Sequence, residues 1–415
     1  MVKPAILGGT PVADLSYMKS RRILENPDKE KEYLLKVFDT GIWNHWNNNG
    51  NLAGEFEALW AEYNTSKYCS LVTNGTHALQ LALEALDIGY GDEVIVPGIT
   101  WQATAGAVCD VNAVPILTDI NKDTFCIDAN MVEKAITSKT RAIICVHLYN
   151  RLSDLDSLLK IAERHGLWLI EDCSHCHGSK FKGKGAGSLG TFGTYSFQSS
   201  KLMQCAEGGA VLTQDRELYG RIMSLRNCGR DFDNIKIHSG NYRITGFQAA
   251  VLIAQLEVLK SKAAYIDKMG HVLDDTLDSL PGVRPLSRNS GTTCQTGYGY
   301  AFSYSPENFD GLPAGIFRSA LSAELGLEFT STYTPLNMSE VYYPHLKRRH
   351  HLGRNYLESI NPANYKLPSA LDIWLNRAVV TRWYIFNSSV KEASYLSDAI
   401  SKIYEHRKDL IKRGI

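Results

Sequence analysis

Residues 169–180, LIEDCSHCHGSK, concentrate side chains that can bind metals or transfer protons. Seven consecutive positions hold two carboxylates, two cysteines and two histidines: Glu171, Asp172, Cys173, His175, Cys176 and His177. The run LWLIED is typical of a buried strand, which would put Asp172 at its carboxyl end and the cysteines and histidines in the loop beyond. Ligands of open α/β sheets gather beyond such strand ends, so a site is expected here.

Two explanations of this segment need nothing outside it. A metal-dependent site would use Asp172, His175 and His177, but the two histidines lack the i, i+4 spacing of a helical zinc pair, and no CxxC partner occurs elsewhere. Alternatively, the cysteines and one histidine simply fill the space under the loop. A third explanation depends on a lysine 29 positions after Asp172.

Lys201 lies in a turn of small residues directly after an apolar strand, within GTYSFQSSKLMQCAEGGAVL. Most lysines are solvated surface charges. An amine at the ligand-binding edge of a sheet, however, can be desolvated and reactive. Such an amine, a carboxylate at a neighbouring strand end, and Ser, Thr and Gly turns that suit a phosphate together describe a pyridoxal phosphate site. A buried Asp172 would favour the protonated pyridine nitrogen that makes this cofactor an electron sink.

Two further strand ends offer groups that could complete such a site. In TNGTHALQLAL, Gly75 and Thr76 open a predicted helix, whose N-terminus supplies the N–H donors that a phosphate needs. A threonine there is equally well explained as a helix cap. In GITWQATAG, Trp101 could stack on a cofactor ring or serve as a core aromatic.

The elements that must position these residues alternate between strand and helix from residue 65 to about 215. The predicted strands are apolar on both faces, as a sheet covered by helices on both sides requires, so the fold class is α/β. We predict strands at 69–72, 92–100, 113–120, 141–149, 167–172, 193–198, 208–213 and 299–305. We predict helices at 75–86, 103–111, 129–137, 154–165, 215–226, 246–260 and 313–325.

The length of 415 residues favours two domains. A polar helical stretch at 256–280 would carry the chain out of the first domain, and a separate strand-and-helix pattern follows it. We therefore predict an N-terminal segment with a large α/β domain at 1–264 and a small α+β domain at 265–415. The segment WNHWNNNGN, residues 43–51, is predicted as a loop that either helps to form the substrate pocket or is an ordinary surface loop.

Composition argues against several classes of partner. The 44 basic and 44 acidic residues balance, which gives no electrostatic reason to expect nucleic acid or an anionic membrane. No window approaches the roughly 20 apolar residues that span a bilayer, and the N-terminus lacks the apolar core of a signal peptide. Nine cysteines without regular spacing indicate reduced thiols. We therefore expect a cytoplasmic protein without a membrane segment.

The order and spacing of the motifs resemble the fold-type I, pyridoxal phosphate-dependent sugar aminotransferases, which make amino sugars and aminocyclitols. The resemblance covers most of the chain and is carried by GTPV, GEFEALWAEY, TNGTHALQLALEALDIGYGDEVIVPGITWQATA, IEDCSHCHGS, SFQSSKLMQCAEGGAV, RNCGR and GNYRITGFQAAVLIAQLE. It implies a mainly parallel seven-stranded sheet flanked by helices, with pyridoxal 5'-phosphate as cofactor and no metal. It also implies a homodimer whose subunits share their active sites.

The resemblance assigns roles to individual residues. Lys201 matches the lysine that forms a Schiff base with the cofactor, and Asp172 matches the partner of the pyridine nitrogen; both would be catalytic. His175 lies where family members place a His or Gln near the cofactor's phenolic oxygen. The other implied contacts are Gly75, Thr76 and Ser196 to the phosphate, Trp101 stacked on the ring, and Asn241 reaching the phosphate from the neighbouring subunit. Lys201 also argues against the dehydratase branch, in which His replaces this lysine.

Three departures from the family pattern concern other positions. The chain has AEGG where Gly-Glu-Gly-Gly is usual, Gly246 where Glu is frequent, and Asn150 where Gly is frequent. The first is a small steric change. The other two lie where contacts to substrate or to a second subunit could differ, so they leave the substrate more open than the cofactor chemistry.

The resemblance implies a ping-pong transamination from an amino acid, glutamine or glutamate, to a keto-cyclitol or keto-sugar in amino-sugar or aminocyclitol biosynthesis of the antibiotic type. The segments VPGITWQATA, IEDCSHCHGS and SFQSSK look most like those of scyllo-inosose and 2-deoxy-scyllo-inosose aminotransferases. Nucleotide-sugar aminotransferases and aminohydroxybenzoate synthases remain alternatives. Alternatives of another class are a metal-dependent hydrolase using Asp172, His175 and His177, and a non-catalytic regulator that binds pyridoxal phosphate.

Overall fold

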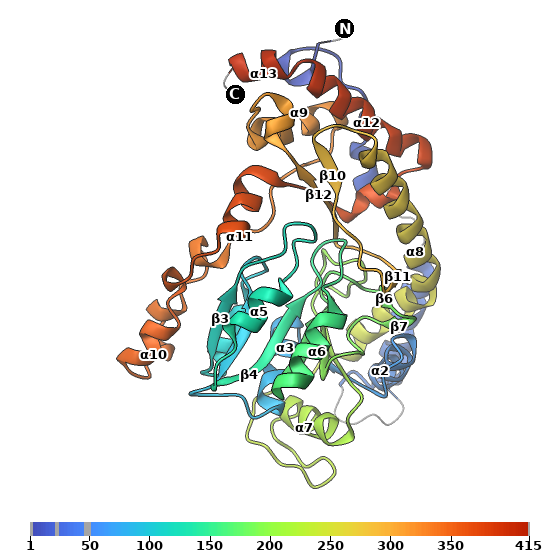
Figure 1. Ribbon diagram of the computed structural model, residues 1–415. Helices are drawn as coiled ribbons and strands as arrows, with labels where there is room; N and C mark the ends of the chain where they lie inside the picture. Colours follow the sequence, from blue (N-terminus) through green and yellow to red (C-terminus); the bar gives the residue numbers. More distant parts are fainter. Residues whose placement is uncertain (1–2, 21–24, 45–50, 414–415) are drawn as a thin grey trace.

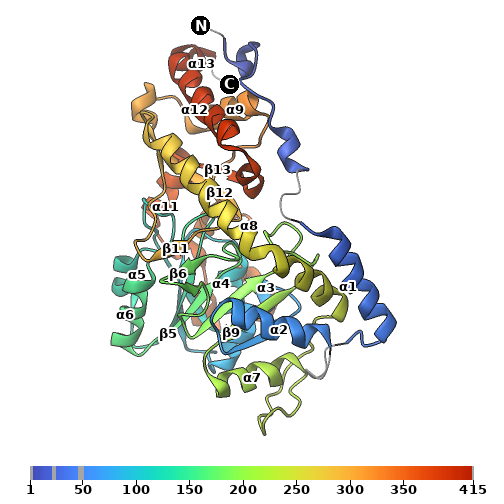
Figure 2. The same ribbon diagram turned by 90° about the vertical axis from the view of Figure 1, so that its right-hand side faces the viewer.

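The computed structural model describes residues 3–20, 25–44 and 51–413, which form two bodies joined by a long helix (Figure 1). The large body surrounds a seven-stranded sheet, and the small body surrounds a three-stranded sheet. Helix α8 (Gly246–Asp278) packs with its first half in the core of the large body and with its second half in that of the small body (Figures 1 and 2). Most of the predicted loop at 43–51 lies outside the described residues.

The seven-stranded sheet has the order β1-β9-β8-β5-β4-β2-β3. Neighbours from β8 to β3 pair in parallel, whereas β9 runs antiparallel to both β8 and β1. The mainly parallel seven-stranded sheet expected from the resemblance is therefore confirmed. Its strands are β1 (Tyr68–Val72), β2 (Glu93–Pro97), β3 (Val114–Thr118), β4 (Thr140–Val146), β5 (Trp168–Asp172), β8 (Phe192–Ser196) and β9 (Gly209–Thr213).

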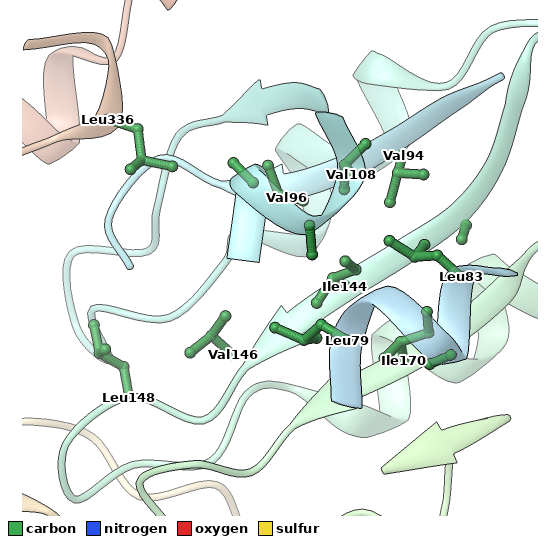
Figure 3. Close-up of a cluster of buried hydrophobic side chains, with 14 of the residues drawn as sticks. Leu79, Leu83, Val94, Val96, Val108, Ile144, Val146, Leu148, Ile170 and Leu336 are labelled. Atoms are coloured by element: carbon green, nitrogen blue, oxygen red, sulfur yellow. The ribbon is translucent and has the colours of Figure 1, made fainter. Parts of the chain in front are cut away.

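Helices cover both faces of this sheet because successive strand residues point to opposite sides. On β4, Ile144 packs with α3 and α4 in one core, whereas Ile143 packs with α2 and α6 in another. Figure 3 shows the first core, in which Leu79 and Leu83 of α3 lie against Ile144 and Ile170 of the sheet. The helices of this body are α1 (Pro27–Thr40), α2 (Leu52–Tyr63), α3 (Gly75–Ala85), α4 (Ala103–Asp110), α5 (Ala129–Ala135), α6 (Leu155–His165) and α7 (Arg216–Arg226).

The small body has a sheet of order β10-β12-β13, with antiparallel neighbours. Its core also takes in side chains from the start of the chain, including Leu7 and Met18. Because α8 runs without a break across position 264, the division at 1–264 and 265–415 stays a prediction. The elements are β10 (Val283–Pro285), β12 (Gly299–Tyr304), β13 (Ala378–Arg382), α9 (Ala314–Leu325), α12 (Val390–Glu405) and α13 (Arg407–Arg413).

Two smaller features connect the bodies. The segment with α10 (Arg354–Ser359) and α11 (Pro368–Asp372) runs down beside the edge strand β3 (Figure 1), where Asp119 accepts hydrogen bonds from the backbone of Ser369 and Ala370. A third sheet, of order β11-β6-β7, pairs β11 (Thr292–Cys294) with β6 (Lys180–Phe181), which is followed by β7 (Lys184–Gly185). Within the described ranges, no helix is both long and apolar enough to cross a membrane.

Candidate active site

A cavity of about 710 Å³ lies at the carboxyl ends of the parallel strands, where the small body faces the large sheet. Seven of the eight residues to which the sequence assigned cofactor contacts line it: Gly75, Thr76, Trp101, Asp172, His175, Ser196 and Lys201. The fold explains this convergence, because parallel strands present their carboxyl ends at one edge of the sheet. The roles of these residues stay predictions, and the geometry shows what each can do.

Lys201 lies in the turn between β8 and β9 and lines the cavity. Burial lowers the pKa of Lys201 to about 8, against the opposing attraction of the Asp172 carboxylate. With this pKa about a tenth of the amine is neutral at pH 7, far more than for an ordinary lysine, and the neutral form is the one that acts as a nucleophile or proton acceptor. The ring of Tyr298 covers the amine, with Nζ 4.4 Å from the ring centroid.

Asp172 ends β5 with its carboxylate held by two donors. Thr104 Oγ1 donates to Oδ2 at 3.1 Å, and the N–H of Ser174 donates to Oδ1 at 3.1 Å. Thr104 itself lies 2.9 Å from the hydroxyl of Thr100. A carboxylate fixed in this way and only 6% exposed is suited to hold a protonated ring nitrogen in the cavity.

His175 is buried and neutral. Its Nδ1 accepts a hydrogen bond from the N–H of Tyr149 at 3.2 Å, so the ring proton belongs on Nε2. Burial, and then the nearby Lys201 charge, lower the pKa of His175 well below its usual range. Nε2 lies 3.4 Å from the hydroxyl of Tyr333 and can donate to an oxygen in the cavity, such as a phenolic oxygen.

The N-terminus of α3 forms a cradle that suits a phosphate. The Asn74 side chain caps the helix by accepting from the N–H of His77 at 2.9 Å. The first N–H groups of a helix point outward from its N-terminus, where they can donate to a bound anion. A Cβ atom on Gly75 would lie 2.7 Å from Cβ of Ser196, so only glycine lets these two backbones approach. Thr76 and Ser196 add hydroxyls at the same wall of the cavity.

Trp101 and Asn241 have different positions. Trp101 is 56% exposed, and its ring lies tilted at 6.0 Å from that of Tyr333 at the cavity wall. Asn241 is exposed, pairs with Asn227 in an isolated bridge, and does not line the cavity of its own chain. Its contact with the phosphate site of a neighbouring subunit stays a prediction.

The remaining members of the opening cluster face the core. Cys173, Cys176 and His177 are buried, and Nε2 of His177 lies 2.9 Å from the carbonyl oxygen of Ser196. Potential metal-ligating atoms converge within 4.8 Å at His147, Cys173 and Cys176, which is not the triad of the hydrolase alternative.

His147 has both ring nitrogens engaged. Its Nδ1 accepts from the N–H of Ser153 at 3.1 Å, and its Nε2 lies 3.1 Å from Glu171 Oε2. These hydrogen bonds explain the position of His147 beside Cys173 and Cys176 by packing and hydrogen bonding within the core.

Sequence reasoning missed the cavity wall that comes from the small body. Tyr298 precedes β12, Tyr333 lies in the loop after α9, and Arg382 ends β13. Tyr298 and Arg382 flank strands, and a single strand pattern gives no sign of the partner surface that its end will meet.

Comparisons with known proteins agree with this site. Residues 27–369 match the DegT/DnrJ/EryC1/StrS aminotransferase family. The chain is 37% identical over 368 residues, 86% of each chain, to the L-glutamine:2-deoxy-scyllo-inosose aminotransferase of Streptoalloteichus tenebrarius. It is 38% identical to the L-glutamine:scyllo-inosose aminotransferase of Streptomyces griseus, over 83% of this chain and 84% of that one.

Solved structures give the same result. The fold superposes on the crystal structure of S. venezuelae DesV with a TM-score of 0.77 and 29% identity, covering 95% of this chain and 98% of that one. The residues in the cavity suit the cofactor of this family, since they supply a reactive amine, a fixed carboxylate and a phosphate cradle. The chain therefore belongs to the DegT/DnrJ/EryC1/StrS family and is a pyridoxal phosphate-dependent aminotransferase.

Proposed function

We propose that this aminotransferase moves an amino group from L-glutamine to a keto-cyclitol, in the biosynthesis of an aminocyclitol of the antibiotic type. The observation that carries the proposal is its similarity, over 83–86% of the chain, to relatives named for L-glutamine and for scyllo-inosose or 2-deoxy-scyllo-inosose. Since both names give the same donor and acceptors of one chemical class, this proposal is preferred to a nucleotide-sugar acceptor.

The residues of the cavity divide the work of such a reaction. Bound pyridoxal phosphate supplies an electron sink that makes the proton on the carbon beside the nitrogen acidic. Lys201 would bind the cofactor's aldehyde carbon and then, as a free amine whose pKa of about 8 is close to neutral pH, carry that proton. Asp172 would hold the ring nitrogen protonated, and His175 would donate from Nε2 to the phenolic oxygen.

The cavity wall also suits a ring that carries many hydroxyls. Gln198 and Ser200 offer amide and hydroxyl groups, and Arg382 offers N–H donors. Trp101 and Tyr333 present flat apolar faces, against which the C–H faces of a cyclitol can pack. This mixture of polar and aromatic groups supports a polyol acceptor.

We also propose a homodimer with shared active sites, in which Asn241 of one subunit completes the phosphate site of the other. Asn241 is exposed and does not line the cavity of its own chain, which supports this arrangement. A cytoplasmic location is proposed because all nine cysteines, each within the described residues, are free thiols. The division into a large domain at 1–264 and a small domain at 265–415 is part of the same proposal.

The test is a transfer assay with purified protein, pyridoxal phosphate and glutamine carrying ¹⁵N at the α-amino group. The acceptors are scyllo-inosose, 2-deoxy-scyllo-inosose and a nucleoside-diphosphate keto-sugar, each with the products read by mass spectrometry. We expect ¹⁵N in the cyclitol amine. Transfer to the nucleotide sugar alone would replace the proposed acceptor, and a folded protein that transfers to none of the acceptors would contradict the proposal.

A further inference from the structure

Tyr298 contacts two side chains of the proposed cofactor site, Lys201 and His175. One contact is with Lys201, whose Nζ lies 4.4 Å from the centroid of the Tyr298 ring. The other is with His175, whose ring stacks on that of Tyr298 at 4.3 Å with an interplanar angle of 19°. A tyrosine from the small body therefore contacts both the reactive amine and the neutral imidazole of the large body.

The position of Tyr298 is fixed by bonds at both ends of the residue. Its N–H donates to the carbonyl of His175 at 2.9 Å, and its own carbonyl accepts from the N–H of Trp383 at 3.0 Å. Its hydroxyl accepts from Arg382 Nη1 at 3.3 Å and lies 3.4 Å from Ser200 Oγ. A ring held in this way cannot easily swing out of the cavity.

The cavity also contains a competing partner for the amine, the carboxylate of Asp172. An ammonium and a carboxylate in a partly buried cavity attract each other strongly. Yet the ion pairs among the described residues include none between Lys201 and Asp172, and the amine lies over the ring instead. Since Asp172 is needed for the ring nitrogen of the cofactor, an uncharged partner for Lys201 leaves that carboxylate available.

We propose that Tyr298 is a positioning residue for Lys201: the face of its ring holds the free amine within the cavity and away from Asp172. This inference rests on the role given to Lys201 in the proposed function. A cation over the face of an aromatic ring is attracted by the ring's negative face, and the attraction grows when water is excluded. The ring thereby partly offsets the cost of burying the ammonium.

Besides burial, the attraction of Asp172 on β5 acts on the pKa of Lys201. The other charged or titratable groups that face Lys201 come from several elements. They are His175, His177, Glu207, Tyr298, Tyr333 and Arg382 on the side of the cavity, and Lys19, Glu25, Glu30 and Lys262 in a second pocket that Lys201 also lines. A test must therefore change the electron density of the Tyr298 ring and leave all these charges in place.

The test compares Tyr298→Phe with the same protein carrying pentafluorophenylalanine at position 298. Fluorination reverses the charge of the ring face with almost no change of shape. Full-length protein is used, both free of cofactor and loaded with pyridoxamine phosphate. The rate at which acetic anhydride modifies Lys201 is followed against pH by peptide mass spectrometry, which gives the pKa of the amine.

We expect the fluorinated ring to lower the pKa of Lys201 by about one unit relative to Tyr298→Phe, as a partly desolvated cation–π contact predicts. Tyr298→Phe should stay within about 0.3 unit of the parent protein, because it keeps the ring. Equal pKa values for the two rings would overturn the proposal. A shift already complete in Tyr298→Phe would assign the effect to the hydroxyl and overturn it as well.

This measurement needs no amino acceptor, so its result is separate from the transfer assay. A protein that fails to aminate any cyclitol can still show the pKa shift, and then only the proposed acceptor is lost. An active enzyme whose Lys201 titrates alike with both rings loses only the role of Tyr298. Circular dichroism spectra that superpose establish that the two variants share one fold.

Discussion

The two walls of the cavity differ in how the chain builds them. The wall from the large sheet consists of strand ends and helix starts: Asp172 ends β5, Lys201 follows β8, and Gly75 begins α3. The wall from the small body brings Tyr298, 97 residues after Lys201, and Arg382 from farther along the chain. The first wall holds the groups proposed to carry out the reaction, and the second wall places and shields them.

The largest expected effect comes from the large-sheet wall. Lys201→Ala removes both the covalent attachment of the cofactor and the proposed proton carrier, so we expect turnover to fall by about four orders of magnitude or more. Product formation from labelled glutamine measures this loss. Circular dichroism checks the fold, and substantial remaining activity in a folded variant would show that another group carries the proton.

Asp172→Asn should cost less, about 10²- to 10³-fold in turnover. The amide keeps the shape but removes the charge that stabilises a protonated ring nitrogen. The melting temperature should change little, because the surroundings of the carboxylate are partly polar and two donors, Thr104 and the N–H of Ser174, remain for the amide. Turnover at the parental level would argue that the ring nitrogen has another partner.

Glu171→Gln is the matched control on the preceding residue of the same strand. Glu171 accepts backbone hydrogen bonds from Gly187, Leu189 and Gly190 and lies 3.1 Å from His147. We expect a loss of about 1–3 kcal/mol in the free energy of unfolding, seen as a lower melting temperature, since a neutral amide weakens bonds to a buried anion. Loss of turnover without loss of stability would contradict this division of roles.

The pH dependence of stability tests the burial of Lys201. Its folded-state pKa of about 8 lies below the value of 10.5 for a solvated lysine, so the unfolded chain binds more protons between these pH values. Stability contributed by this site is therefore low below pH 8 and rises as pH increases toward 10.5. We expect the melting temperature of the cofactor-free protein to rise relative to Lys201→Met over this window. A constant difference would mean that the amine is not desolvated.

The smallest effect is expected at the wall from the small body. Tyr333→Phe removes a hydroxyl that lies 3.4 Å from His175 Nε2, a long contact that the histidine can replace with a bond to a ligand oxygen. We expect turnover to change by no more than about threefold, since a long neutral hydrogen bond contributes little. A loss of turnover comparable to that of Asp172→Asn would place Tyr333 among the reacting groups. The two walls would then not differ in their contribution to the reaction.

Prediction from sequence succeeded for the large sheet and for β12 and α9 of the small body, but it missed the wall that the small body contributes to the cavity. Apolar runs on both faces predicted the buried parallel strands, and the strand ends marked the edge of the sheet that carries Asp172 and Lys201. His175 and His177 show the limit of such patterns. They are two positions apart in one loop, yet one lines the cavity and the other packs in the core.

The sequence by itself determined the order of the functional groups along the chain: a helix start suited to a phosphate at Gly75, a carboxylate at Asp172 and an amine at Lys201. Local hydrophobic patterns and turns place each of these groups at the end of a strand or the start of a helix. Only the tertiary structure decided what covers them. Tyr298 reaches Lys201 because α8 carries the small body back over the edge of the large sheet. Packing between bodies depends on surfaces far apart in sequence, and no local periodicity records which of them will meet.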